Sequence, residues 1–118
     1  MISESTEGTG PRILVVDDNP ANVDLLVRRL VRDGYCVFSL DSAVNLEAEM
    51  ERIEPDAILL DWMMPDRSGV DALKGVRGLR DANRMPVIMV TARGEGDAVS
   101  EAIEAGANDY VTKPIDFA

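Results

Sequence analysis

Three short, uninterrupted apolar runs constrain the fold of this chain more than any other feature. They are Ile13–Val16, Ala57–Leu60 and Val87–Val90. Each run lies close after a proline, and no charged residue interrupts any of them. A strand that is apolar at consecutive positions is buried on both faces, which is typical of a parallel sheet covered by helices on both sides. The runs therefore predict strands of such a sheet.

Helical patterns alternate with these strands. Asn19 and Pro20 form a capping residue followed by proline at the first helical position, and Gly34 is a stop signal. Between them, apolar residues recur at helical spacing, at Val23, Leu26, Val27, Leu30 and Val31. The sequence further predicts strands at Tyr35–Leu40 and Asp109–Thr112. Leu46, Met50 and Ile53 mark a short helix, and a further helix is predicted at Asp97–Glu104. Val70, Leu73 and Val76 mark another helix, whose propensity is weakened by Gly75 and Gly78. This order of elements predicts a single α/β domain.

Charge and composition exclude several classes of protein. The 118-residue chain has a formal net charge of −10, which would oppose a nucleic-acid backbone, so direct nucleic-acid binding is not expected. Residues 1–11 are predicted to be a polar N-terminal tail without a leader pattern, and no apolar stretch reaches the ~20 residues that cross a bilayer. The single cysteine, Cys36, cannot form an internal disulfide, which suits a reducing compartment. We therefore expect a cytoplasmic protein with no membrane segment. Part of the acidity is interpreted as a solvated helix face, at Glu47, Glu49, Glu51 and Glu54.

Polar residues stand at the ends of the predicted parallel strands. Asp17 and Asp18 follow the first, Asp61 the third, Thr91 the fourth, and Lys113 the fifth. The carboxyl ends of parallel strands share one edge of a sheet, and ligands bind at that edge. Clustered carboxylates repel one another, and a divalent cation offsets that repulsion. Oxygen ligands in a chain without histidine favour Mg²⁺ or Mn²⁺ over zinc.

The ammonium and hydroxyl groups at the same edge suit a phosphoryl group. The arrangement therefore predicts Asp61 as a nucleophile beside a metal ion. Any one of these residues would also fit a helix cap or an ordinary turn, so the prediction depends on their occurring together.

These residues lie in motifs that resemble the receiver domain of two-component response regulators. The motifs are "ILVVDDNPAN", "ILLDWMMPDRSG", "VIMVTA" and "DYVTKP", and the resemblance covers about residues 12 to 116. It implies a flavodoxin-like, doubly wound parallel sheet of five strands in the order 2-1-3-4-5. It also implies a phosphoprotein of two-component signal transduction that takes part in phosphorelay.

The resemblance assigns the metal site and the phosphoacceptor. Asp61 would accept a phosphoryl group from a histidine kinase or a phosphotransfer protein and form an aspartyl phosphate. Asp18 and Asp61 would bind Mg²⁺ directly together with the backbone carbonyl of Met63, and Asp17 would act largely through water. The domain would catalyse its own phosphorylation and dephosphorylation at Asp61 without being a turnover enzyme.

The resemblance also assigns the groups that bind phosphate and the switch. Lys113 would pair with a phosphate oxygen, and Thr91 and the Ala92 amide would donate hydrogen bonds to the phosphoryl group. Thr91 would then draw the loop after the fourth strand inward, and Tyr110 would follow. The cofactor implied is Mg²⁺.

A receiver domain has a fifth helix after its Lys-Pro turn, and this sequence ends about where that helix would begin. We therefore expect residues 12–118 to be a receiver domain truncated before its fifth helix, with the output domain or effector outside this chain. Without that helix, one face of the sheet would lack a cover. We expect either that another chain covers this face, for example in a homodimer, or that the domain is less stable.

Three other kinds of protein share part of this pattern. A phosphatase of the haloacid-dehalogenase kind needs a second aspartate two residues after the nucleophile, and Met63 stands there. A flavin carrier needs a hydroxyl-rich phosphate loop after the first strand, where Asp17 and Asp18 would repel phosphate. A receiver-like interaction module that works without phosphorylation stays open as the alternative.

Overall fold

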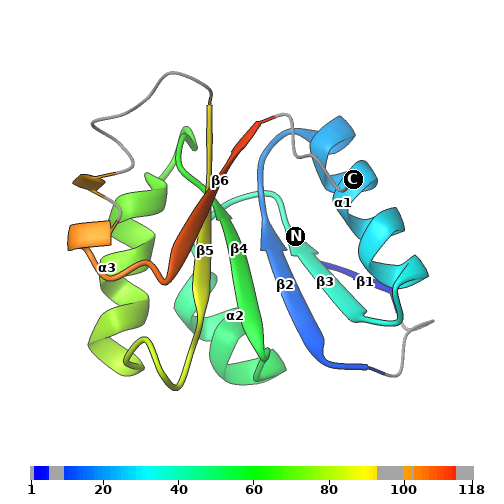
Figure 1. Cartoon of the computed structure of the whole chain (residues 1–118), viewed down its shortest axis with the longest axis horizontal. Coiled ribbons are helices and arrows are strands. Elements are labelled where there is room, and N and C mark those ends of the chain that lie inside the picture. Colours follow the sequence, from blue (N-terminus) through cyan, green and yellow to red (C-terminus); the bar gives the residue numbers. More distant parts are fainter. Residues whose placement is uncertain (1, 6–9, 93–99, 102, 114–118) are drawn as a thin grey trace.

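The computed structural model of the chain describes residues 2–5, 10–92, 100–101 and 103–113. The described residues form one sheet of six strands in the order β1-β3-β2-β4-β5-β6 (Figure 1). The strands are β1 Ile2–Ser5, β2 Arg12–Val16, β3 Cys36–Leu40, β4 Ala57–Asp61, β5 Val87–Ala92 and β6 Asp109–Lys113.

Five of these strands form the sheet that the sequence predicts. Strands β2 to β6 pair in parallel, and their spatial order β3-β2-β4-β5-β6 is the order 2-1-3-4-5 when they are counted along the chain. The predicted doubly wound, flavodoxin-like α/β sheet is therefore confirmed.

An additional strand, β1, lies at one edge of the sheet. It pairs antiparallel with β3, with Ile2 opposite Leu40 and Ser5 opposite Val37. The polar tail expected over residues 1–11 thus contributes a strand in its first part. Such an edge strand needs only backbone hydrogen bonds on one side, so a sequence as polar as "ISES" can form it without an apolar pattern.

Helices cover both faces of the sheet, as the apolar runs require. Helix α1 (Pro20–Arg32) packs on one face, where its Leu26 joins Ile13 and Val15 in a core cluster. Helices α2 (Leu46–Ile53) and α3 (Gly69–Leu79) pack on the other, in the larger cluster that contains Leu14 and Val16. Residues Ile13–Val16 of β2 therefore point alternately to opposite faces and are all buried, which explains the unbroken apolar run.

Two predicted segments fall partly or wholly outside the described residues. The predicted helix at Asp97–Glu104 begins outside them, and residues 100, 101, 103 and 104 are helical. Residues 114–118, where the fifth helix was expected to begin, also lie outside them. Within the described ranges, no helix has the length and apolar character needed to span a membrane.

Candidate functional site

Three carboxylates meet at the carboxyl edge of the sheet. Strands β2 and β4 are neighbours with Val16 opposite Leu60, so Asp17 follows β2 beside Asp61, the last residue of β4. One oxygen from each of Asp17, Asp18 and Asp61 lies within 4.8 Å of the others. Asp17 and Asp61 are only 2% and 4% exposed, whereas Asp18 is exposed. The structure therefore brings together all three acidic residues singled out from the sequence.

The first turn of α1 orients Asp17. One carboxylate oxygen of Asp17 accepts a hydrogen bond from the Asn19 amide at 2.9 Å, and the other accepts one from Nδ2 of Asn22. Asn19 also caps the helix, because its side chain accepts from the amides of Ala21 and Asn22. Sequence reasoning found the cap but missed Asn22, whose position in the first turn after the acidic pair was the available signal.

The electrostatics of the cluster favour a hard cation. Two like charges about 5 Å apart repel by roughly 3 kcal/mol at an effective dielectric constant of about 20. The atoms that could bind a metal ion in this cluster are carboxylate oxygens, and the chain contains no histidine. Mg²⁺ prefers carboxylate and carbonyl oxygens and keeps several water ligands, so the residues present fit this ion.

The loop between β4 and α3 (residues 62–68, the β4–α3 loop) folds back over Asp61. The Trp62 amide donates to the Val90 carbonyl at 2.9 Å, and the Gly69 amide donates to the Trp62 carbonyl at 2.9 Å. Met63 lies in this loop, two residues after Asp61, with its side chain 63% exposed. The loop therefore returns the chain to the same edge of the sheet that carries the acidic cluster.

The other predicted site residues lie on β5 and β6. Asp61 is opposite Val90 of β5, and Thr91 and Ala92 follow Val90 along that strand, so they reach the same edge. Ala92 is in register with Lys113, the last residue of β6. The side chains of Thr91, Ala92 and Lys113 lie outside what the structure describes. Tyr110 is in register with Met89 and is 41% exposed.

Gly69 is the residue that allows the close return of the loop. A Cβ atom at this position would lie 2.2 Å from the Asp61 carbonyl oxygen and 2.9 Å from the Trp62 Cα. We expect Gly69→Ala to lower the free energy of unfolding by about 2 kcal/mol, because the backbone beside Asp61 must move. The matched control is Gly78→Ala on the same helix, where a Cβ atom meets nothing within 4 Å. Urea unfolding should show the control unchanged or up to about 1 kcal/mol more stable. Equal stabilities for the two variants would contradict this account of Gly69.

Comparison with known proteins identifies the family. The sequence model described as the response regulator receiver domain matches residues 13–118. The chain belongs to this family. It is therefore a receiver domain of two-component response regulators, as its motifs implied.

Curated relatives of the receiver domain are longer proteins. The phosphate regulon transcriptional regulatory protein PhoB of Rhizobium meliloti (strain 1021) is 36% identical over 104 residues, which are 88% of this chain and 46% of that protein. The transcriptional regulatory protein KdpE of Mycobacterium tuberculosis (strain ATCC 25618 / H37Rv) is 38% identical over 102 residues, which are 86% of this chain and 44% of that protein. The chain thus spans less than half the length of these relatives.

Solved receiver domains share the fold. A response regulator receiver domain protein from Methanospirillum hungatei JF-1 superposes with a TM-score of 0.81 at 32% identity, over 90% of this chain and 83% of that one. The receiver domain of sensor histidine kinase PA1611 from Pseudomonas aeruginosa PAO1 superposes with a TM-score of 0.82 at 32% identity, over 92% of this chain and 88% of that one. That second structure has a magnesium ion coordinated in its active site cleft.

Proposed function

We propose that this receiver domain is a switch that is phosphorylated on Asp61 in a reaction that requires Mg²⁺. The observation that carries the proposal is the acidic cluster, in which oxygens of Asp17, Asp18 and Asp61 lie within 4.8 Å of one another at the ligand-binding edge of the sheet. Asp61 is the member at the end of the central strand β4 and is almost fully buried, which suits a nucleophile shielded from water.

Asp18, Asp61 and the backbone carbonyl of Met63 would hold Mg²⁺ directly. Both oxygens of Asp17 already accept hydrogen bonds from the start of α1, which suits a role through water. When bound, the ion would neutralise charge on the carboxylates and on the incoming phosphoryl group. The magnesium-bound receiver domain of PA1611, a relative with 32% identity, supports this assignment.

The phosphoryl group would come from a phosphohistidine of a histidine kinase or a phosphotransfer protein. A carboxylate oxygen of Asp61 attacks phosphorus, the P–N bond to the histidine breaks, and a P–O bond to Asp61 forms. Water later attacks the same phosphorus, releasing phosphate and restoring Asp61. The domain would therefore catalyse its own phosphorylation and dephosphorylation at Asp61 and would not be a turnover enzyme.

Thr91, Ala92 and Lys113 would bind the phosphoryl oxygens. Their backbone positions at the ends of β5 and β6, beside β4, support this assignment. The phosphoryl group adds roughly −1.5 to −2 of charge and new acceptor oxygens, which would draw Thr91 inward, and Tyr110 would follow. The response would then pass to an output domain or an effector protein.

One experiment tests the proposal directly. The protein is incubated with acetyl phosphate, with Mg²⁺ or with a chelator, and its intact mass is measured. We expect a gain of one phosphoryl group that requires Mg²⁺. No gain under conditions where calorimetry shows Mg²⁺ to be bound would overturn the proposal and favour an interaction module that works without phosphorylation.

A further inference from the structure

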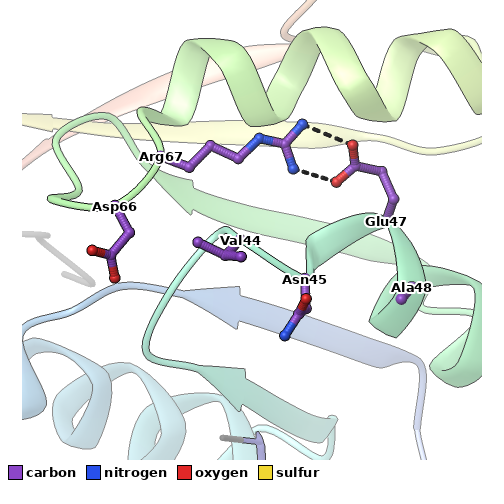
Figure 2. Close-up of a pocket in the computed structure, with 6 residues that line it drawn as sticks. All are labelled: Val44, Asn45, Glu47, Ala48, Asp66 and Arg67. Atoms are coloured by element: carbon purple, nitrogen blue, oxygen red, sulfur yellow. Dashed lines mark hydrogen bonds and ion pairs between the residues drawn. The ribbon is translucent and has the colours of Figure 1, made fainter.

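An ion pair between Arg67 and Glu47 ties the β4–α3 loop to helix α2. Figure 2 shows the Arg67 side chain reaching from the loop across to Glu47, whereas Asp66 points away from the pair. Nη2 of Arg67 donates to one carboxylate oxygen of Glu47 at 2.7 Å, and Nη1 donates to the other. The pair is therefore bidentate, which fixes the direction of approach as well as the distance.

The guanidinium of Arg67 also reaches two backbone carbonyls. Nη1 donates to the Ala43 carbonyl before α2 at 3.2 Å, and Nη2 donates to the Asp71 carbonyl in the first turn of α3 at 3.4 Å. The side chains of Arg67 and Glu47 are only 24% and 31% exposed. The hydrogen bond from Arg67 lowers the pKa of Glu47, so the carboxylate stays charged. One side chain thus joins the loop to three other segments of the chain.

Helix α3 is shaped to admit this pair. A Cβ atom at Gly75 would lie 2.2 Å from Oε2 of Glu47 and 2.5 Å from Nη2 of Arg67. Glycine in the middle of a helix is unfavourable, so its presence here calls for a reason. The space that Gly75 leaves for the pair is such a reason, and it indicates that the pair has a defined place in the fold.

The tied loop is the one that carries Met63. The ends of the loop are held by the hydrogen bonds of Trp62 and Gly69, and Arg67 holds its later half. We propose that Arg67 is a positioning residue for the metal site. By holding the β4–α3 loop against α2, it keeps the Met63 carbonyl where it completes the Mg²⁺ ligands. This inference rests on the proposed function, because it takes Mg²⁺ bound by Asp18, Asp61 and Met63 as its starting point.

The test is the affinity of the intact chain for Mg²⁺, measured by calorimetry at a temperature where each variant is shown to be folded. We expect Arg67→Met to weaken Mg²⁺ binding by roughly tenfold, as for other residues that support metal ligands from outside the ligand set. Loss of a positive charge near an acidic site would by itself tighten cation binding. Weaker binding therefore has the sign that positioning predicts and that simple electrostatics does not.

Arg80→Met is the matched control. Arg80 pairs with Glu51 of α2 at 2.9 Å, so it joins α2 to the end of α3 but does not hold the β4–α3 loop. This control should bind Mg²⁺ within about twofold of the wild type.

Gly75→Ala is a second test that keeps both charges of the pair. Its methyl group would overlap both Glu47 and Arg67 and displace the pair from its place beside α3, while alanine favours the helix. We expect this variant to bind Mg²⁺ roughly threefold more weakly, and Gly78→Ala to bind it as the wild type does. If the wild type binds no Mg²⁺, the proposed function fails and this inference fails with it. If the wild type binds Mg²⁺ but Arg67→Met and Gly75→Ala bind it as tightly or more tightly, only the inference is overturned.

Discussion

Asp61→Asn is expected to take up no phosphoryl group from acetyl phosphate under conditions that phosphorylate the wild type completely. An amide oxygen is not a nucleophile toward phosphorus, and the variant cannot form an acyl phosphate. Intact mass measures the outcome with and without Mg²⁺. Asparagine has nearly the same shape as aspartate, so it fits the almost fully buried position of Asp61 at the end of β4.

Asp66→Asn is the matched control for this variant. Asp66 is an exposed carboxylate in the β4–α3 loop, outside the acidic cluster, so the substitution removes the same charge from the loop that follows Asp61. We expect this control to take up one phosphoryl group. Uptake by Asp61→Asn at the wild-type rate would move the phosphoacceptor to another residue, and peptide mapping would then locate it.

Asp61→Asn should also lose the stabilisation that Mg²⁺ provides to the folded protein. A ligand that binds only the folded state at ten times its dissociation constant adds about 1.4 kcal/mol to the free energy of unfolding. Urea unfolding of the wild type should show this increase, and Asp61→Asn should show little of it, because one proposed metal ligand is replaced. An equal increase in both proteins would remove Asp61 from the ligand set.

The sheet could be predicted from the sequence because burial leaves a direct trace in the residue pattern. Ile13–Val16 is apolar at every position since α1 covers one face of β2 and α2 and α3 cover the other. The acidic cluster could be predicted as well, because Asp18 comes shortly after β2 and Asp61 ends β4, and the parallel arrangement of these strands sends both to one edge.

Contacts that depend on side-chain reach could not be predicted in the same way. The sequence predicts Glu47 and Glu51 on a solvated helix face, yet they pair with Arg67 and Arg80, far along the chain. Strand β1 was not predicted, because a strand at the edge of a sheet pairs through backbone groups that every residue carries, so its sequence shows no pattern. Local patterns report burial, and they do not report which distant polar groups meet.

Arg77→Met is expected to lower the free energy of unfolding by about 3 kcal/mol, the largest loss of stability predicted for this chain. Arg77 lies on α3, and its Nε donates to the Gly106 carbonyl at 2.7 Å. Its Nη1 donates to the Met85 carbonyl at 2.7 Å, and its Nη2 donates to Oδ1 of Asn108 at 2.8 Å. Burial lowers the pKa of Arg77, because the charged guanidinium loses part of its water, and these acceptors replace that water. Methionine keeps most of the bulk but leaves the acceptors without their charged donor. A hydrogen bond to a charged group contributes about 1.5–3 kcal/mol net of the exchange with water.

Arg28→Met is the matched control for Arg77, because it removes the same charge from an exposed pair. The side chain of Arg28 is 79% exposed, and it pairs with Asp24 at 3.1 Å within α1. Such a pair contributes about 0.5 kcal/mol or less. Urea unfolding measures both variants, and equal small losses would show that the contacts of Arg77 with Met85, Gly106 and Asn108 add little to the stability of the fold.

Arg77 lies away from the acidic cluster, so its substitution should affect the stability of the fold but not the phosphorylation reaction. Its acceptors lie just before β5 and β6 begin, at the edge of the sheet opposite the acidic cluster. Asn108 extends the same network, since its side chain accepts from the Val87 amide at 2.9 Å and donates to the Ala82 carbonyl at 2.9 Å. At a temperature where Arg77→Met is still folded, we therefore expect it to take up a phosphoryl group at close to the wild-type rate. A large loss of phosphorylation in the folded variant would mean that the two edges of the sheet are coupled, with β5 and β6 carrying the effect to the site.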